Sequence, residues 1–170
     1  KVLLIKRNNE PQKGLMALPG DFLDSSISIY DSAKNTLKEL TNLENIYLEQ
    51  IRAFGEIDRY PDKRVITISY YALINIEHYS PQPGYTAEKL EWCDIDSLPN
   101  LAFDHKEIIK SAHKRLKIRV GNEPIGFNLL PECFSLTNLQ KVYEAILQIE
   151  LNKRNFRTKN RKRCNRQTVM

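Results

Sequence analysis

The chain has 170 residues, of which 41% are hydrophobic and 28% charged, a balance typical of globular rather than disordered proteins. Its apolar runs are strand-sized, far short of the roughly 20 apolar residues of a membrane span, and it shows no signal-peptide pattern, so we expect a cytoplasmic protein. Cys93, Cys133 and Cys164 are too widely spaced for a zinc site or a disulfide framework and are expected to stay reduced.

The net charge of +5 is distributed unevenly along the chain. Residues 152–166 contain eight basic side chains and no acidic one. The other 18 basic and 21 acidic residues leave the rest of the chain at −3. A mildly acidic body with a strongly basic end is typical of a protein that binds a polyanion such as nucleic acid, although a solvated basic terminus accounts for the charge equally well.

The first part of the chain predicts a strand, a turn-rich loop and an amphipathic helix. Residues 2–5 are apolar and strand-like, and because Lys1 already lies at their edge we expect further residues before them. Residues 10–20 hold two prolines and two glycines, which predict turns. From Ser28 onward apolar residues recur at three- and four-residue spacing, which predicts a helix ending at Asn42, a residue that tolerates the left-handed conformation.

Strands are expected in the middle of the chain. Residues 47–54 and 64–76 are rich in β-branched and aromatic side chains, and they flank a hairpin loop at 58–63. A short strand at 90–93 is expected to precede a helix over 105–119, because the apolar residues of that helix share one face.

The last part of the chain predicts a linker followed by two helices. The Gly-Asn-Glu-Pro segment at 121–124 is the expected linker. Ser135 is expected to cap a helix, and Asn152 to cap a second helix with Phe156 as its buried anchor. The expected apolar face of the first helix consists of Leu139, Val142, Tyr143, Ile146 and Leu147.

The segment LPGDFLDSSISIYDSAKNTLKELTNL, residues 18–43, resembles the Nudix box, whose helix presents several glutamates that hold Mg²⁺. The helical frame is retained, but the first glutamate position is Ile27, the Arg-Glu pair is 35–36 (Asn-Thr), and one of the Glu-Glu pair is Leu40. Of that pair Glu39 alone remains. One carboxylate cannot build the metal site, so we expect no catalytic residue, no metal, no cofactor and no enzymatic activity.

A denser resemblance covers PIGFNLLPECFSLTNLQKVYEAILQIELNKRNFRTK, residues 124–159. It is similar to the winged helix-turn-helix of Nudix-related transcriptional regulators of the NrtR/AraR type, and closest to the arabinose-responsive AraR-like branch. The resemblance implies an α/β/α Nudix-like sandwich with a mixed sheet over 1–120. A winged helix-turn-helix domain over 121–170 would follow it, with a truncated wing because 163–170 is short and polar.

The resemblance also implies a repressor of sugar or arabinose utilisation genes that binds a palindromic double-stranded DNA operator as a homodimer. A recognition helix enters the major groove by its first turns, where Arg and Asn read base edges and Lys and Thr hold phosphates. A charged helix that merely faces solvent is the alternative. The residues expected to contact DNA are Lys153, Arg154, Asn155, Arg157, Thr158 and Lys159.

The Nudix-like domain is expected to bind a small effector in or near the former catalytic cleft. The resemblance implies ADP-ribose in some family members and L-arabinose in the AraR-like branch. Loss of carboxylates at Ile27 and Leu40 makes the cleft more apolar, which favours a neutral sugar. Arginines could hold a diphosphate, and a sugar needs hydrogen-bonding groups beside an aromatic ring. The candidate effector contacts are Arg7, Glu39, Arg59, Arg64, Tyr70, Trp92, Asp104 and His105, with Tyr71 as the alternative to its neighbour.

Three other functions stay open at this stage. The chain could be an active Nudix hydrolase of ADP-ribose or another nucleoside diphosphate, or an ADP-ribose-responsive regulator of NAD metabolism. It could also be a non-enzymatic domain that binds RNA or a protein through its basic end.

Overall fold

A computed structural model describes residues 1–85, 87–122 and 135–167, and the side chains of 1–85, 87–120 and 135–160. The chain forms two compact units. The first comprises Lys1–Ala72 with Ile76–Ala112, and the second Leu73–Asn75 with His113–Met170. We describe each unit by itself.

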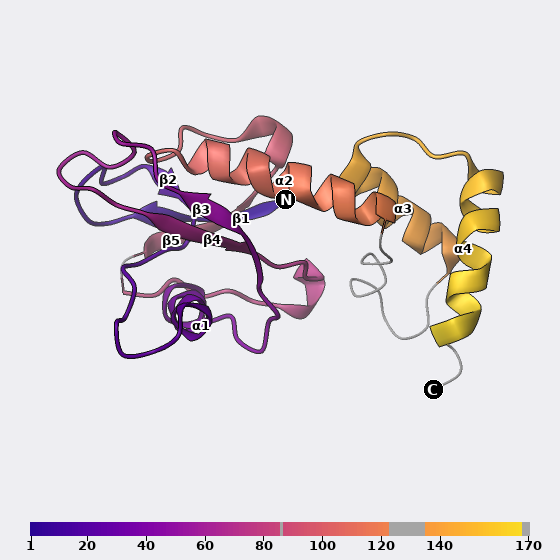
Figure 1. The fold of residues 1–170 in the computed structure, drawn as a ribbon, viewed down its shortest axis with the longest axis horizontal. Helices are drawn as coiled ribbons and strands as arrows, with labels where there is room; N and C mark the ends of the chain where they lie inside the picture. The colour runs from indigo at the N-terminus through magenta and orange to yellow at the C-terminus, as the bar shows by residue number, and fades with distance from the viewer. Residues whose placement is uncertain (86, 123–134, 168–170) are drawn as a thin grey trace. The chain divides into compact units, whose positions relative to one another are not determined.

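A three-stranded antiparallel sheet lies in the first unit (Figure 1). Its central strand, β1 (Val2–Arg7), pairs with β2 (Met16–Ala17) on one side and with β5 (Ala87–Cys93) on the other. Apolar side chains of β1 are buried on both faces, which explains why its sequence is a continuous apolar run.

A second antiparallel pair is formed by β3 (Glu49–Phe54) and β4 (Thr67–Tyr71). The strand predicted over 64–76 is therefore shorter than expected. Tyr71 pairs with Glu49, the first residue of β3, so the chain beyond Tyr71 has no partner in that strand. The residues that follow turn instead through a short 3₁₀ helix, η1 (Ile76–His78).

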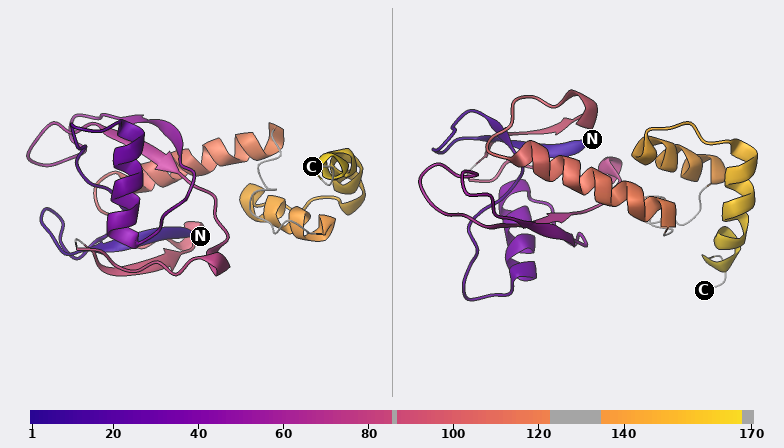
Figure 2. Two further views of the ribbon diagram at one scale, coloured as in Figure 1. Left: turned by 90° about the horizontal axis from the view of Figure 1, so that it is seen from below. Right: turned by 45° about the horizontal axis from the view of Figure 1, so that its top comes forward.

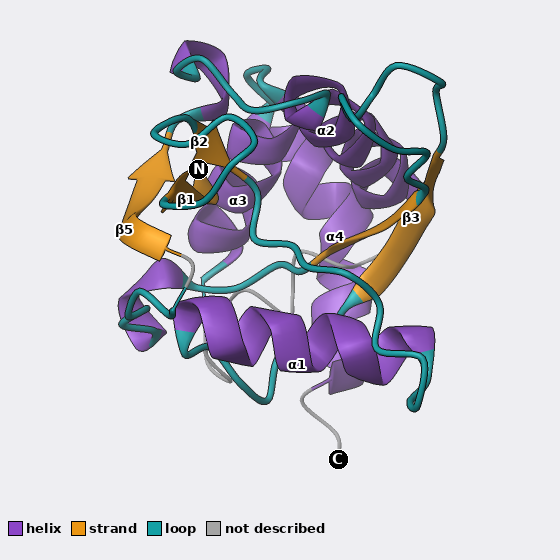
Figure 3. Ribbon diagram, turned by 90° about the vertical axis from the view of Figure 1, so that its left-hand side faces the viewer, coloured by secondary structure: helices purple, strands orange, loops and turns teal. Residues whose placement is uncertain are grey.

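The pairing in the first unit is mixed, as the resemblance implied. A parallel bridge joins Met16 to Leu101, next to the antiparallel ladders. The strands lie between α1 (Ile29–Thr41) and the first turns of α2 (His105–Asn122), which Figures 1 and 3 both show. This is the three-layer α/β/α arrangement expected from the sequence.

The predicted boundaries of α1 are confirmed by its capping groups. The Oγ of Ser28 accepts a hydrogen bond from the backbone N–H of Asp31 at 3.0 Å. Asn42 adopts the left-handed conformation with φ 55°, and its N–H donates to the carbonyl of Lys38 at 2.8 Å. Both ends of α1 are thus encoded by residues next to it.

The loop before β5 is held against the last turn of α1. The N–H of Gln82 donates to the carbonyl of Thr41 at 2.9 Å, and that of Gly84 to the carbonyl of Leu40 at 3.1 Å. A Cβ atom at position 84 would lie 1.8 Å from the carbonyl oxygen of Glu39. Glycine is therefore required where this loop approaches the helix.

The core of the first unit forms where β1 meets α2 and the chain before it. Leu4 packs with Cys93 and Ile109, while Ile5 packs with Ala17 and other small side chains. Cys93 is a free thiol, and burial raises the pKa of that thiol. The other two cysteines lie outside the residues whose side chains are described.

The helix predicted over 105–119 is longer than expected. α2 runs to Asn122, so the first two residues of the predicted linker at 121–124 end the helix instead. The units divide within this same helix, between Ala112 and His113. Residues 123–134, which hold the rest of the linker and the start of the second resemblance, lie outside the described residues. The domain division at residues 120–121 stays a prediction.

The second unit contains the end of α2 and two further helices (Figure 2), α3 (Leu136–Leu147) and α4 (Lys153–Gln167). The Oγ of Ser135 caps α3 by accepting from the N–H of Asn138 at 3.1 Å, as predicted. The rings of Tyr143 and Phe156 meet edge to face, with centroids 5.3 Å apart. They form a core with Leu139 and Val120, which confirms Phe156 as the buried anchor of α4.

None of the described helices is long and apolar enough to cross a membrane.

Candidate functional site

The first turns of α4 form a basic surface. Lys153, Arg154, Arg157 and Thr158 line a hollow of about 400 Å³. Every residue from 153 to 159 is exposed except Phe156, which faces the core. The structure thus places all six predicted DNA contacts on the exposed part of one helix.

The N-terminus of α4 is attractive to phosphate groups, and a side chain caps it. The first turn of α4 contains no acidic residue, so the positive end of the helix dipole adds to the side-chain charges. The N–H of Asn155 donates to the Oδ1 of Asn152 at 3.0 Å, which confirms the predicted cap.

The turn between α3 and α4 is fixed by a polar network that the sequence analysis did not predict. The Oε1 of Glu144 accepts from the Nε2 of Gln140 at 2.8 Å and from the N–H of Leu151 at 3.0 Å. These bonds, chiefly the one from Gln140, lower the pKa of the Glu144 carboxyl. The same Gln140 nitrogen donates to the carbonyl of Leu151 at 2.9 Å. The network holds the chain that leads into α4 against α3.

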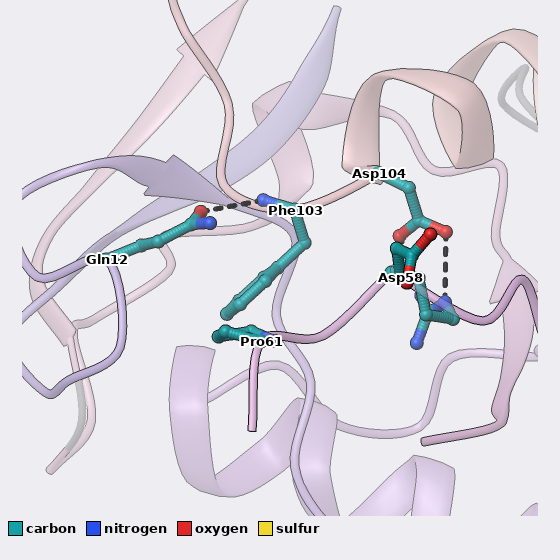
Figure 4. A pocket seen from close by; sticks show the side chains of 6 residues that line it. Gln12, Asp58, Pro61, Phe103 and Asp104 are labelled. Atoms are coloured by element: carbon teal, nitrogen blue, oxygen red, sulfur yellow. Dashed lines mark hydrogen bonds and ion pairs between the residues drawn. The ribbon is translucent and has the colours of Figure 1, made fainter. Parts of the chain in front are cut away.

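The first unit contains a pocket of about 340 Å³ (Figure 4). Its walls come from the β1–β2 hairpin, from the loop between β3 and β4, and from the residues just before α2. Figure 4 shows the Phe103 ring lying beside Pro61, with the carboxylates of Asp58 and Asp104 across from them. The lining residues are Gln12, Asp58, Arg59, Pro61, Phe103 and Asp104.

Arg59 and Asp104 form a two-point ion pair at this pocket. The Nε of Arg59 donates to one carboxylate oxygen of Asp104 at 2.9 Å, and its Nη2 to the other at 2.7 Å. Nη1 donates to the hydroxyl of Thr67 in β4. The side chain of Arg59 is 4% exposed, and Asp104 is the residue before α2. We predicted both as effector contacts, and the structure shows them bound to each other.

Phe103 has an unusual backbone conformation that shapes the pocket. Its φ of 52° lies in the left-handed region, which is uncommon for a residue with a bulky side chain. Its N–H donates to the Oε1 of Gln12 at 2.8 Å. Its ring stacks on Tyr60 with centroids 5.1 Å apart, and the guanidinium of Arg7 lies 5.0 Å from its centroid. Sequence reasoning missed Gln12, Tyr60 and Phe103, because no pattern within the chain signals these contacts.

His105, another predicted effector contact, is bonded to the protein backbone. Its Nδ1 accepts from the N–H of Leu18 at 2.9 Å. Burial lowers the pKa of His105 to about 4; the charge of Asp104 opposes this, and Arg59 and Arg7 add to it. The ring is therefore neutral near pH 7, and it joins the start of α2 to the end of β2.

Four other predicted effector contacts do not line this pocket. Glu39 and Arg64 are exposed, and Trp92 pairs with Leu3 across the β1–β5 ladder. The ring of Tyr70 packs edge to face against Tyr30, and its hydroxyl donates to Gln50 at 3.3 Å. Their role in effector binding stays a prediction.

The donor groups of α1 do not fit the metal of a Nudix box. The carboxylate of Asp31 is already bonded to the hydroxyl of Ser28 at 2.7 Å and to the Nζ of Lys34 at 3.0 Å. That leaves Glu39 as the other carboxylate on the helix. Across the described residues, no group of three or more His, Cys, Asp or Glu side chains could hold a metal ion.

Comparison with known proteins finds similar proteins for both parts of the chain. Residues 126–163 match the model of the NrtR DNA-binding winged helix domain. The chain is 37% identical over 161 residues to the "ADPR responsive transcriptional repressor NtrR" of Acinetobacter baylyi, across 92% of this chain and 64% of that protein. It is 36% identical over 110 residues to an ADP-ribose pyrophosphatase of Methanocaldococcus jannaschii, across 65% of this chain and 64% of that protein. The chain thus spans less than two thirds of either relative.

Solved structures agree with this assignment. A MutT/nudix family protein from Enterococcus faecalis has a TM-score of 0.83 at 28% identity, over 92% of this chain and 71% of that one. Shewanella oneidensis NrtR complexed with a 27mer DNA has a TM-score of 0.76 at 29% identity, over 94% and 74%. The NUDIX domain of that protein, complexed with ADP ribose, has a TM-score of 0.61 at 32% identity, over 67% and 76%.

The fold and the basic helix define a Nudix-like domain followed by a winged-helix DNA-binding domain. The sequence relatives narrow the class further. The chain is similar to NrtR-like regulators, which combine these two domains. The arabinose-responsive branch that we expected finds no support among these relatives, since their names refer to ADP-ribose.

Proposed function

We propose that the protein is a transcriptional repressor that binds DNA through α4 and responds to ADP-ribose. The observation that carries this proposal is the exposed surface of α4, with its basic side chains over a buried Phe156. A recognition helix must present such side chains at its first turns to reach base edges and phosphates together.

ADP-ribose is the effector that the family relationship favours. A relative that is 37% identical is named as an ADPR-responsive repressor, and a NUDIX domain that is 32% identical was solved with ADP ribose. Loss of carboxylates from α1 removes the means to hold a metal, but it does not remove the means to bind a nucleotide. L-arabinose, our first expectation for the effector, is the rival ligand in the test below.

The Nudix-like domain of this protein senses its ligand without hydrolysing it. A single free carboxylate on α1 supplies too few oxygen ligands for a hard cation such as Mg²⁺. The rival function is ADP-ribose hydrolysis, which the relative named ADP-ribose pyrophosphatase favours. Mg²⁺-dependent release of AMP from ADP-ribose by the purified protein would establish that rival function.

The DNA-binding test is a fluorescence-anisotropy titration of the full-length protein into duplex from its own upstream region, at two salt concentrations. We expect sequence-specific binding that survives the higher salt and weakens with ADP-ribose but not with L-arabinose. Arg154→Ala should weaken binding, whereas Lys38→Ala, an exposed basic residue on α1, should not. Binding that is equal for all sequences and vanishes with salt would reduce the interaction to electrostatic attraction and overturn the proposal.

The operator is a palindrome bound by a homodimer. Two copies of α4 then address two half-sites separated by whole helical turns of DNA. Sedimentation of the protein–operator complex should give two chains per duplex, and one chain per duplex would contradict this arrangement.

A further inference from the structure

The polar groups that the 340 Å³ pocket offers to a ligand are mainly acceptors. Arg59 is the one cation in its lining, and three of its five N–H groups already donate within the protein. Asp58 is exposed and lines the same pocket as Asp104. Each carboxylate oxygen of Asp104 accepts one bond from Arg59 and retains capacity for another. The two carboxylates therefore favour a ligand group that donates hydrogen bonds.

The opposite wall of the pocket is apolar. Phe103 and Pro61 lie side by side there (Figure 4). A ring with hydroxyls on one edge and C–H groups on the other suits a pocket with carboxylates on one wall and an aromatic ring on the other. The volume is near the low end of the ~300–1,000 Å³ typical of ligand pockets, so it accommodates one ring rather than a whole ADP-ribose.

We propose that this pocket binds the vicinal hydroxyls of a sugar ring, with Asp58 and Asp104 as acceptors and Phe103 as the apolar wall. The inference rests on the proposed function, in which that ring is a ribose of ADP-ribose, whose phosphates lie outside the pocket. A free sugar offers the same hydroxyl chemistry, so the experiment includes one.

The ion pair links this pocket to the start of α2. The backbone carbonyl of Asp104 accepts from the N–H of Glu107 at 2.8 Å and from that of Ile108 at 3.2 Å, which makes Asp104 part of the first turn. A ligand that bonds to its carboxylate shares that group with Arg59. The residues of α2 from His113 onward belong to the second unit. A change at Asp104 therefore acts on a helix that both units share.

The test compares Asp58→Asn with Asp62→Asn by calorimetry on the full-length protein. Asp62 is an exposed carboxylate in the same loop that does not line the pocket. Loss of a hydrogen bond to a charged acceptor should weaken ADP-ribose binding roughly tenfold in Asp58→Asn. Asp62→Asn should bind as the wild type does, and both variants should keep the wild-type melting temperature.

The outcomes separate this inference from the proposed function. If ADP-ribose binds the wild type and Asp58→Asn equally well, the pocket assignment fails and the proposed function stands. If ADP-ribose does not bind the wild type but D-ribose or L-arabinose does, and Asp58→Asn weakens it, the proposed effector fails and the pocket stands. If none of these ligands binds the wild type, both fail. In each binding case, the amide resonance of Phe103 should shift on ligand addition.

Discussion

At the scale of single residues, the Arg59–Asp104 pair is the contact on which the pocket depends. Removing one member of a buried ion pair leaves the other charge without its partner. We therefore expect Asp104→Ala to lower the free energy of unfolding of the first unit by about 3 kcal/mol, because Arg59 stays buried. Asp62→Ala, an exposed carboxylate in the same loop as Arg59, should change it by less than about 0.5 kcal/mol. Urea unfolding followed by the fluorescence of Trp92, the one tryptophan of the sequence, measures both.

His105 gives the first unit a pH-dependent stability. Its folded pKa of about 4 lies below the 6.5 of the unfolded chain, so the unfolded state binds the proton more tightly. Stability is then complete above pH 6.5 and falls as the pH drops toward 4, by up to about 3 kcal/mol. In His105→Asn, whose amide can still accept from Leu18 but does not titrate, this slope should disappear. Parallel pH profiles for the wild type and the variant, again from Trp92 fluorescence, would contradict the assignment.

At the scale of elements, the cap of α4 connects stability to DNA binding. Asn152→Ala removes the bond to the N–H of Asn155 and should cost about 1 kcal/mol of helix stability. Because the proposed DNA contacts lie in the turns that follow, operator affinity should fall as well. Ser28→Ala removes an equivalent cap from α1 and should leave operator affinity unchanged. Operator affinity is measured by anisotropy. Equal affinity for Asn152→Ala and the wild type would show that the start of α4 does not contribute to DNA binding.

The helices could be predicted from the sequence because their signals are local. Ser28, Asn42 and Ser135 mark helix ends through bonds to residues three or four positions away. The predicted strand ends were less accurate than the predicted helix ends, because the end of β4 depends on where β3 begins. The pocket could not be predicted as a unit. Its main contacts join residues 45 positions apart, in the Arg59–Asp104 pair, and 91 apart, in the bond from Phe103 to Gln12.

At the scale of the whole molecule, positive charge is concentrated in the segment that contains the proposed DNA contacts. The residues outside 152–166 carry −3, whereas that segment carries eight positive charges. DNA is therefore drawn to one end of the sequence, and the acidic remainder contributes no general attraction that would compete with it. The pocket contains two carboxylates, whereas the exposed surface of α4 is basic, so the proposed effector and the proposed DNA contacts use different sites.

The salt dependence of operator binding distinguishes phosphate contacts from base contacts on α4. Each phosphate that a cation neutralises adds about 0.9 to the slope of log affinity against log salt. Lys153→Ala should therefore lower affinity and reduce the slope by about one, because an ammonium group holds phosphate as a point charge. Asn155→Ala should lower affinity by a similar factor with the slope unchanged, because an uncharged amide releases no counterion and reads an adenine edge. Anisotropy titrations at four salt concentrations measure both slopes. If Asn155→Ala changed the slope as much as Lys153→Ala, α4 would bind DNA by non-specific electrostatic attraction and not by base-specific contacts.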